Sequence, residues 1–324
     1  MENENGFGVA DYSVFAGVLV ISCGIGLYFS YKGNKSPEEF FMGNRILHPL
    51  PVSMSLLTTL FSSLSMLGFA AEAYANGMQL SMFILGVVFA IIFSSYLIMP
   101  ILYPLKLTSI NEYIFLRFKS KRLRICLTFI TVTRILIVSG FSLYATTIVL
   151  ASITKLNTMA NIFLLGIVCS TYSAFGGIRA VVWTDFFQMF VMVLGMIIVI
   201  IVGCALSGGF IETLMSLSPF VRHTFFNTLI YGFINYSRIY GVEQYCVQRI
   251  YSVKSFKNAR KVLTYNILGI SVLVLPIFVG GLVAFANYVG CDPMVLGIIK
   301  KKDQIMPYFV TDKLSFILAF RIIC

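Results

Sequence analysis

The sequence predicts an all-α membrane protein that crosses the bilayer several times, and three observations carry this prediction. Of the 324 residues, 58% are hydrophobic and only 11% are charged, against about a quarter in an ordinary soluble domain. The mean hydropathy is +0.90, although a soluble fold of this size leaves roughly a quarter of its chain surface in water. The apolar residues form runs about as long as a spanning helix, and none alternates as barrel strands do. A soluble enzyme, a disordered tail and a nucleic-acid binder are therefore excluded.

Charged or Pro/Gly-rich breaks divide the chain into eight predicted spans. The spans are 11–31, 50–75, 79–103, 124–151, 159–177, 181–206, 225–247 and 262–288. A ninth apolar run begins near Leu314 and reaches Cys324, which is too short to cross a bilayer.

The basic residues gather in alternate loops and predict the orientation. Fifteen of the 24 Lys and Arg residues lie in 32–48, 104–124, at Arg179 and in 248–261, whereas the opposite loops hold six. Because cytoplasmic loops carry the excess of Lys and Arg, these loops are predicted to be cytoplasmic and the N-terminus extracellular. Topology and contact with the anionic lipid of the bilayer then explain most of the net charge of +11.

Hydroxyl side chains crowd the middle of the span 50–75. They are Thr58, Thr59, Ser62, Ser63 and Ser65. For any single one, a contact between helices is the more ordinary role. Together they favour a helix that unwinds there, because hydroxyls can satisfy backbone groups that an unwound helix frees. Unwound carbonyls at the midplane are the oxygen ligands that a sodium ion prefers.

A second polar feature follows Gly176 and Gly177, which are predicted to break the helix between the spans 159–177 and 181–206. Asp185 then enters the following span. Two interpretations stay open. The carboxylate interacts with the positive end of the helix dipole, or it lies on an ion pathway, as acids within a membrane often do.

The seventh span carries a stripe of polar residues that lines either a cavity or a partner helix. The stripe consists of Asn235, Tyr236, Arg238, Tyr240, Glu243, Gln244 and Gln248. Arg238 and Glu243 are five positions apart and are predicted to meet only through a neighbour. Arg134 lies about a third of the way into its own span, where a charge needs a carboxylate or a path to water. No phosphate loop, metal-ligand spacing or nucleophile–base pair is present in the sequence, so neither an enzyme nor a cofactor is predicted.

Four stretches, in chain order, carry a family resemblance. They are SPEEFFMGNRILHPLPVSMSLLTTLFSSLSMLGFAAEAYANG, TYSAFGGIRAVVWTDFFQ, RHTFF with YGVEQYCVQRIYSVKSFKNARK, and CDPMVLGIIKKKDQIMPYFVTDKLS. With them the chain resembles the sodium:solute symporter family from about Asp11 to Ser315. Within that family it is most similar to the sodium-coupled monocarboxylate and multivitamin transporter branch.

The resemblance implies a partial leucine-transporter-like inverted-repeat fold, with a leading helix and about seven core helices. One transmembrane domain, 1–324, would contain the leading helix 11–31, a first five-helix repeat 50–206 and an incomplete second repeat 225–324. Substrate and sodium, the coupling ion, would bind where the first helix of each repeat is broken.

By position, the resemblance also implies site residues. The carbonyls of Thr58 and Phe61 would bind sodium, and Asp185 would lie at its site or pathway. The implied substrate contacts are Ser62, Ser65, Tyr236 and Tyr240. Sugar-transporting relatives carry a polar pair where this chain has Leu64 and Ser65, which favours a small organic anion over a sugar.

The chain also departs from the family pattern. Glu243-Gln244 stands where Asn-Gln is usual, and Arg134 stands where relatives carry an uncharged residue. The final FILAFRIIC stops where the Ser/Thr-rich sodium half-site would follow. Two hypotheses therefore remain. One is sodium-coupled symport of a monocarboxylate or vitamin-like anion across the plasma membrane by alternating access. The other is a truncated, non-transporting isoform or an incomplete gene model of such a transporter. The substrate, the sodium stoichiometry and the oligomeric state stay open.

Overall fold

The computed structural model describes residues 9–32, 36–153, 157–215 and 224–314. These residues are mostly helical, with a longer irregular connection over 288–301 and one isolated bridge between Leu47 and Val253. In chain order the α-helices are α1 (Val9–Lys32), α2 (Pro37–Met42), α3 (Pro49–Leu60), α4 (Ser63–Asn76), α5 (Phe83–Phe93), α6 (Met99–Leu102), α7 (Ile110–Phe118), α8 (Lys121–Ile153), α9 (Thr158–Leu206), α10 (Phe210–Met215), α11 (Phe225–Val242), α12 (Gln244–Tyr251), α13 (Phe256–Asn287) and α14 (Ile305–Lys313). The predicted short run at 315–324 lies outside the described residues.

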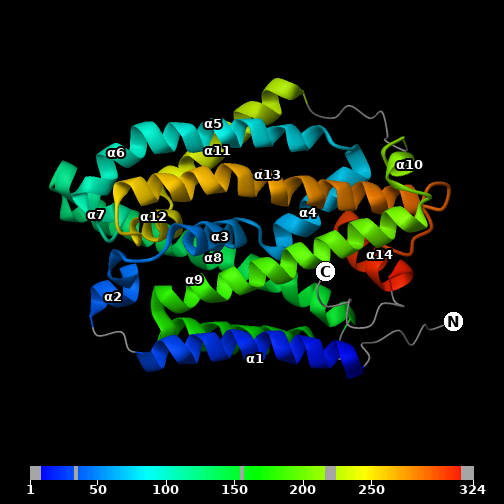
Figure 1. Ribbon diagram of the computed structural model, residues 1–324, viewed down its shortest axis with the longest axis horizontal. Helices are drawn as coiled ribbons and strands as arrows, with labels where there is room; N and C mark the ends of the chain where they lie inside the picture. The colour runs from blue at the N-terminus through cyan, green and yellow to red at the C-terminus, as the bar shows by residue number, and fades with distance from the viewer. Residues whose placement is uncertain (1–8, 33–35, 154–156, 216–223, 315–324) are drawn as a thin grey trace.

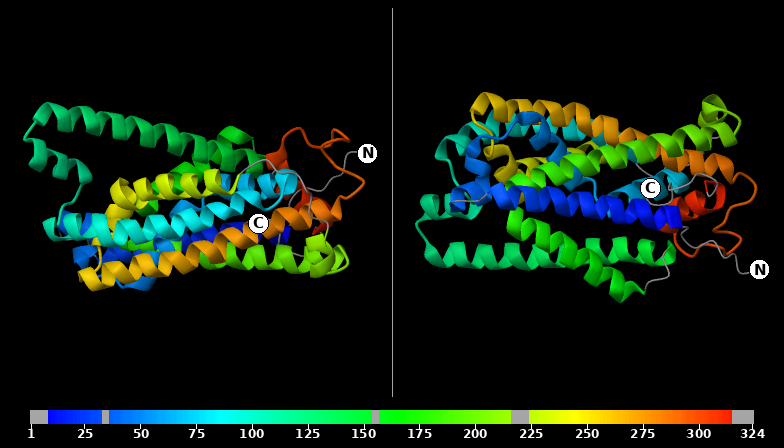
Figure 2. Two further views of the ribbon diagram at one scale, coloured as in Figure 1. Left: turned by 90° about the horizontal axis from the view of Figure 1, so that it is seen from above. Right: turned by 60° about the horizontal axis from the view of Figure 1, so that its bottom comes forward.

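The long helices run side by side along the long axis of the molecule (Figure 1). The helix α13 lies at the centre, where 56% of its apolar window is buried, whereas none of the window of α8 is buried. Figure 2 shows α8 along one side of the bundle. Glycines allow the closest approaches between helices. A Cβ at Gly232 of α11 would lie 2.2 Å from the Phe83 carbonyl oxygen of α5, so only glycine fits there.

Five helical segments of the described chain are long and apolar enough to cross a membrane, and the bent pair α3–α4 makes a sixth. The eight predicted spans all fall on helices. Two of them are less clear as spans, because Thr158–Thr171 is apolar but shorter and the 18-residue α11 carries the polar stripe. The chain is therefore a multi-pass membrane protein.

The predicted break between the fifth and sixth spans is confirmed. Gly177, inside α9, has φ 60° and ψ −163°, a conformation that other residues rarely adopt. The two halves of α9 fold back on each other at this point (Figure 1). Beyond the turn, Arg179 pairs with Glu39 of α2 at 2.8 Å, which ties the turn to the chain ahead of α3.

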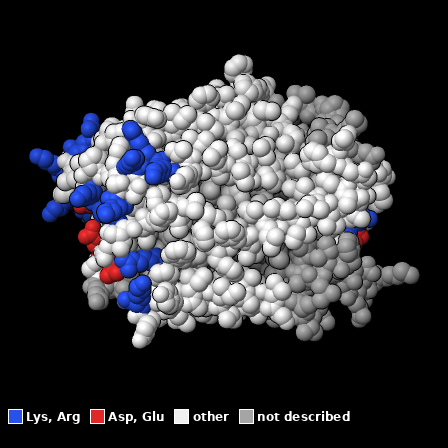
Figure 3. Space-filling view, in the orientation of Figure 1, with Lys and Arg blue, Asp and Glu red and all other residues white. Residues whose placement is uncertain are grey.

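Basic side chains gather at one end of the molecule. Figure 3 shows Lys and Arg at the end where Figure 1 has α2, α7 and α12. Few charged side chains are visible over the middle of this face, where the long helices are apolar. The two ends of the bundle therefore differ in charge, whereas the side of the membrane that each end faces stays a prediction.

Candidate functional site

The chain leaves helical geometry in the middle of its second span, between α3 and α4. Phe61 has φ −104° and ψ 74°, Ser62 has φ −72° and ψ 167°, and the two helices meet at a bend of 62°. The Ser65 hydroxyl donates to the Leu60 carbonyl across the break at 3.4 Å. Because the last four carbonyls of an α-helix lack a donor within it, α3 ends in carbonyl oxygens that can face a cation. The unwinding predicted from the hydroxyl cluster is therefore confirmed.

Two of the three residues predicted to bind or conduct sodium lie in contact. The Thr58 hydroxyl is 3.0 Å from the Met54 carbonyl oxygen and 3.1 Å from the carbonyl oxygen of Asp185. Phe61 lies one turn further along the chain, where α3 ends, and its side chain is buried. The structure thus joins the end of α3 to the second half of α9. The binding of sodium by these three residues stays a prediction.

The Asp185 carboxylate has a partner that the sequence analysis missed. The Nη2 atom of Arg249, in α12, lies 3.0 Å from Oδ2 of Asp185. The Ser55 hydroxyl donates to the same oxygen at 2.5 Å, and Arg249 Nε donates to the Ser55 hydroxyl at 2.7 Å. Both charged side chains are nearly buried, with 13% and 11% of their surface exposed. The charge pattern predicts Arg249 in a cytoplasmic loop, so it was not expected to pair with Asp185. The only signal in the sequence was that an acid within a membrane usually has a charged partner.

The position of Asp185 bears on the helix-dipole interpretation, whereas its place on an ion pathway stays a prediction. Asp185 lies eight residues beyond Gly177, more than two turns into the second half of α9. The effect of a helix dipole is confined to the first turn, so it does not explain this carboxylate. Side chains from α3 and α12 surround Asp185, and the cluster couples three helices.

Tyr236 and Tyr240, which were predicted to contact substrate, lie in an aromatic stack inside the bundle. The Tyr236 ring stacks on Phe83, with centroids 5.9 Å apart, and lies 6.5 Å from the Tyr240 ring. The Tyr240 hydroxyl donates to Oδ1 of Asn266 at 2.9 Å, and Nδ2 of Asn266 donates to the Ser53 hydroxyl at 2.9 Å. The hydroxyl of Tyr240 therefore already has a partner in the described structure.

Ser62 and Ser65, the other two predicted substrate contacts, lie at the break between α3 and α4. Within the described part of the chain, no hydrogen bond joins them to Tyr236 or Tyr240. The link runs through an aromatic ring, because Phe69 of α4 packs 5.3 Å from the Phe83 ring on which Tyr236 stacks. The structure thus places the two tyrosines in the core and the two serines, half-buried, at the helix break, and it does not bring the two pairs into contact.

A second helix breaks at Glu243, which corrects the prediction of one continuous span over 225–247. The helix α11 ends at Val242, Glu243 is extended with φ −70° and ψ 127°, and α12 begins at the next residue. The Glu243 carboxylate accepts from Arg134 of α8 at 2.5 Å and from Arg238. The two residues predicted to meet through a neighbour, Arg238 and Glu243, therefore bond directly, because the end of the helix lets Glu243 turn back.

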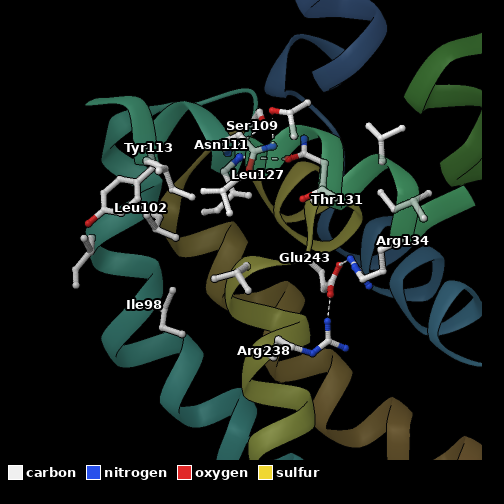
Figure 4. A pocket seen from close by; sticks show the side chains of 18 of the residues that line it. Ile98, Leu102, Ser109, Asn111, Tyr113, Leu127, Thr131, Arg134, Arg238 and Glu243 are labelled. Atoms are coloured by element: carbon white, nitrogen blue, oxygen red, sulfur yellow. Dashed lines mark hydrogen bonds and ion pairs between the residues drawn. The ribbon is translucent and has the colours of Figure 1, made fainter. Parts of the chain in front are cut away.

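An open groove of about 720 Å³ lies beside this second break. Apolar side chains of the helices α6, α7 and α8 form most of its walls, among them Leu102, Tyr113 and Leu127. In Figure 4, Arg134 and Arg238 reach Glu243 from two different sides. These three are the only charged residues among those described along the groove. One carboxylate balances one guanidinium, so the groove carries one unbalanced positive charge.

Comparison with known proteins identifies the relatives of the chain. A sequence profile of the sodium:solute symporter family matches residues 40–319. The mouse sodium-coupled monocarboxylate transporter 2 is 38% identical over 317 residues, which cover 93% of this chain and 51% of the relative. The human sodium/iodide cotransporter is 36% identical over 321 residues, which cover 94% of this chain and 50% of the relative. The chain spans about half the length of the curated relatives it matches.

One solved structure shares the fold. A Na⁺-coupled sialic acid symporter, in its substrate-bound outward-open state, superposes with a TM-score of 0.85 at 23% sequence identity. The match covers 98% of this chain and 69% of that chain. At this identity the likeness establishes the fold alone, and it confirms the predicted all-α, leucine-transporter-like membrane fold. The division into a leading helix and two repeats stays a prediction.

Proposed function

Because the chain belongs to the sodium:solute symporter family, we propose that its protein carries a small organic anion across the plasma membrane together with sodium. The anion is a monocarboxylate or a vitamin-like acid. Sodium binding favours the outward-open state and so completes the substrate site, and alternating access then releases both inside. Since the chain spans about half the length of its curated relatives, the proposal concerns the whole protein.

The observation that carries the proposal is the break between α3 and α4 beside Asp185. The broken helix supplies carbonyl oxygens at Thr58 and Phe61, and Thr58 contacts the second half of α9 directly. Oxygen atoms in an unwound membrane helix suit a hard cation such as sodium. We assign sodium to Thr58 and Phe61, with Asp185 on its pathway, and the substrate to Ser62 and Ser65 on the other side of the break.

Tyr236 and Tyr240 enter the proposal as the inner wall of the substrate site. Their rings are stacked and buried, at 7% and 3% exposure, so they contribute shape and apolar surface. We assign the polar substrate contact of the pair to the Tyr236 hydroxyl, because the Tyr240 hydroxyl is bonded to Asn266.

An anionic substrate is supported by two relatives. Their printed names refer to monocarboxylates and to iodide, and both are anions. Moving an anion into a negative cell interior costs about 2.3 kcal/mol per charge per 100 mV. Each sodium ion that enters with the anion offsets one negative charge, so coupling opposes this electrical penalty.

The proposed orientation has an extracellular N-terminus. The end of the molecule with α2, α7 and α12 carries most of the visible Lys and Arg side chains (Figure 3), as cytoplasmic ends of membrane proteins do.

Uptake measurements test the proposal. Cells would express the chain, and in parallel a fusion of the chain to the C-terminal half of the mouse sodium-coupled monocarboxylate transporter 2. Uptake of radiolabelled lactate, nicotinate or biotin is expected in sodium medium and is expected to vanish when choline replaces sodium. Equal uptake in both media by the fusion would refute the function.

A matched pair of variants tests the assigned acid. Asp185→Asn removes the buried charge, and Asp303→Asn removes an exposed charge outside the predicted spans. The first is expected to lower the apparent affinity for sodium at least tenfold in the uptake assay, and the second to leave it unchanged. The same sodium dependence in both variants would exclude Asp185 from the ion pathway.

A further inference from the structure

We propose that Arg134 and Arg238, which share the carboxylate of Glu243, form a binding site for the carboxylate group of an amphiphilic monocarboxylate in the groove beside the second helix break. This inference rests on the proposed function for the class of substrate. It assigns the recognition of negative charge to residues that lie apart from the α3–α4 break.

The first argument is the charge of the groove. Arg134, Arg238 and Glu243 are the charged residues among those described along its walls. They sum to one positive charge. A lone charge within a membrane is costly unless a counter-charge or water reaches it. A bound monoanion neutralises the groove completely, whereas a neutral solute leaves the cost in place and a dianion overcompensates.

The second argument is the geometry of the donors. Glu243 lies behind the two arginines with 6% of its side chain exposed, whereas 43% of Arg134 and 48% of Arg238 are exposed. Each guanidinium has five N–H donors. Arg134 uses Nη2 on Glu243, and Arg238 uses Nη1 on Glu243 and Nη2 on Asn235. The remaining donors can bond a second carboxylate, and planar guanidinium groups bind carboxylates especially well.

The third argument is the shape and polarity of the groove. Its volume of about 720 Å³ is within the range of small-molecule sites. Apart from the charged cluster, the walls are mainly apolar side chains of α6, α7 and α8, such as Leu102, Ile114 and Leu127. An anion with a short apolar tail uses both parts of this surface. A fully hydrated inorganic anion uses only the charged part.

The depth of the cluster also fits a solute in transit. Arg134 lies ten residues beyond Arg124 on α8, roughly 15 Å at the rise of an α-helix. On the predicted span 124–151 this places Arg134 about a third of the way in, and Glu243 directly precedes α12, at the end of the molecule where Lys and Arg gather. A carboxylate held there lies inside the bilayer, nearer to the proposed cytoplasmic end.

Direct binding tests the proposal. The full chain would be reconstituted in nanodiscs of phosphatidylcholine without sodium, and binding of ¹⁴C-butyrate would be measured by scintillation proximity. Saturable binding is expected, with no competition by butyramide, its neutral analogue. Arg134→Gln and Arg238→Gln are each expected to weaken binding at least tenfold, whereas Glu243→Gln removes the competing carboxylate and is expected to strengthen it.

The opposite signs separate the proposal from a purely structural clamp between α8 and α11. If the three side chains only hold the helices together, all three glutamine variants lose stability. In that case the arginine variants do not weaken butyrate binding and Glu243→Gln does not strengthen it. If a glutamine variant does not elute as a single species in size-exclusion chromatography, Arg134→Lys and Glu243→Asp replace it, because they keep the charge and change the geometry. Lys254→Gln, at the same end of the molecule but outside the groove, is the control and should bind as the unmodified chain does.

Several results would overturn the inference. Absence of saturable butyrate binding would do so, as would binding that Arg134→Gln and Arg238→Gln leave unchanged. Displacement of butyrate by phosphatidylserine in the nanodisc would instead assign the groove to an anionic lipid. Binding with the expected signs, together with uptake that does not need sodium, would reject the proposed function and leave this site standing.

Discussion

The buried pair between Asp185 and Arg249 makes a quantitative prediction about stability. Arg249→Met removes the cation, keeps much of the side-chain volume and leaves the carboxylate with the Ser55 hydroxyl as its remaining side-chain partner. Asp185→Asn removes the opposite charge and keeps the shape. The double variant removes both charges together.

The expected magnitudes follow from burial. Only 13% of Asp185 and 11% of Arg249 is exposed, so neither charge can regain full hydration when its partner is lost. Breaking such a pair costs about 3–5 kcal/mol, whereas replacing both members by neutral groups is often close to neutral. Each single variant should therefore lose about 3–5 kcal/mol of unfolding free energy, and the double variant should lose less than either.

Reversible unfolding in mixed detergent micelles measures these free energies. The fluorescence of Trp183, the single tryptophan of the chain, reports on the transition from a position two residues before Asp185. Lys313→Gln is the control, because the pair Lys313–Asp312 is longer, at 3.4 Å, and 40% and 36% exposed, and exposed pairs contribute about 0–1 kcal/mol. If the loss of unfolding free energy in the double variant equals the sum of the two single losses within about 0.5 kcal/mol, the two residues are not coupled. A cost of Arg249→Met no larger than that of the control would refute the argument from burial.

Three further predictions follow from the packing and the topology. Gly232→Ala should lower the unfolding free energy by about 1–3 kcal/mol through overpacking, since its Cβ would meet a carbonyl oxygen at 2.2 Å. The control Gly140→Ala should be neutral or stabilising, because a Cβ there has nothing within 4 Å. Equal melting temperatures of the two variants would contradict this prediction. Asn266→Leu leaves two buried hydroxyls without their amide partner and should cost about 1–3 kcal/mol, measured in the same unfolding assay; no loss would show that water replaces the amide. In a variant whose sole cysteine is Cys291, an impermeant maleimide should label the protein on intact cells. In a variant whose sole cysteine replaces the exposed Lys254, labelling should require permeabilised cells. The reverse pattern would invert the proposed orientation.

Helix positions were predictable because they depend on local properties of the chain. Runs of apolar residues and the charged segments between them are visible in the sequence, and six of the expected spans pass the same test of length and hydropathy in the structure. The break at Gly177 was also predictable, since only glycine readily adopts its backbone angles. The break at Phe61 and Ser62 was predictable from the hydroxyl residues that surround it.

The break at Glu243 was not predictable in the same way. Gly241 lies one residue before Val242, where α11 ends. Glycines also lie inside helices of this chain, as Gly232 does within α11, so Gly241 did not by itself mark a break. Glu243 is extended where its carboxylate meets Arg134 of α8 and Arg238. Arg134 and Glu243 each depart from the pattern implied by the family resemblance, and the structure shows that these two departures contact each other.

The sequence by itself determined the class of protein, the membrane environment, most helix boundaries and the residue types that a membrane does not tolerate without a reason. Those features follow from composition and from the spacing of residues along the chain, and the amino-acid sequence contains both. Only the tertiary structure decided the partners of the charged residues: Arg249 for Asp185, 64 positions away, and Arg134 for Glu243, 109 positions away. A buried charge needs a counter-charge within a few ångströms, and that distance depends on how the helices pack.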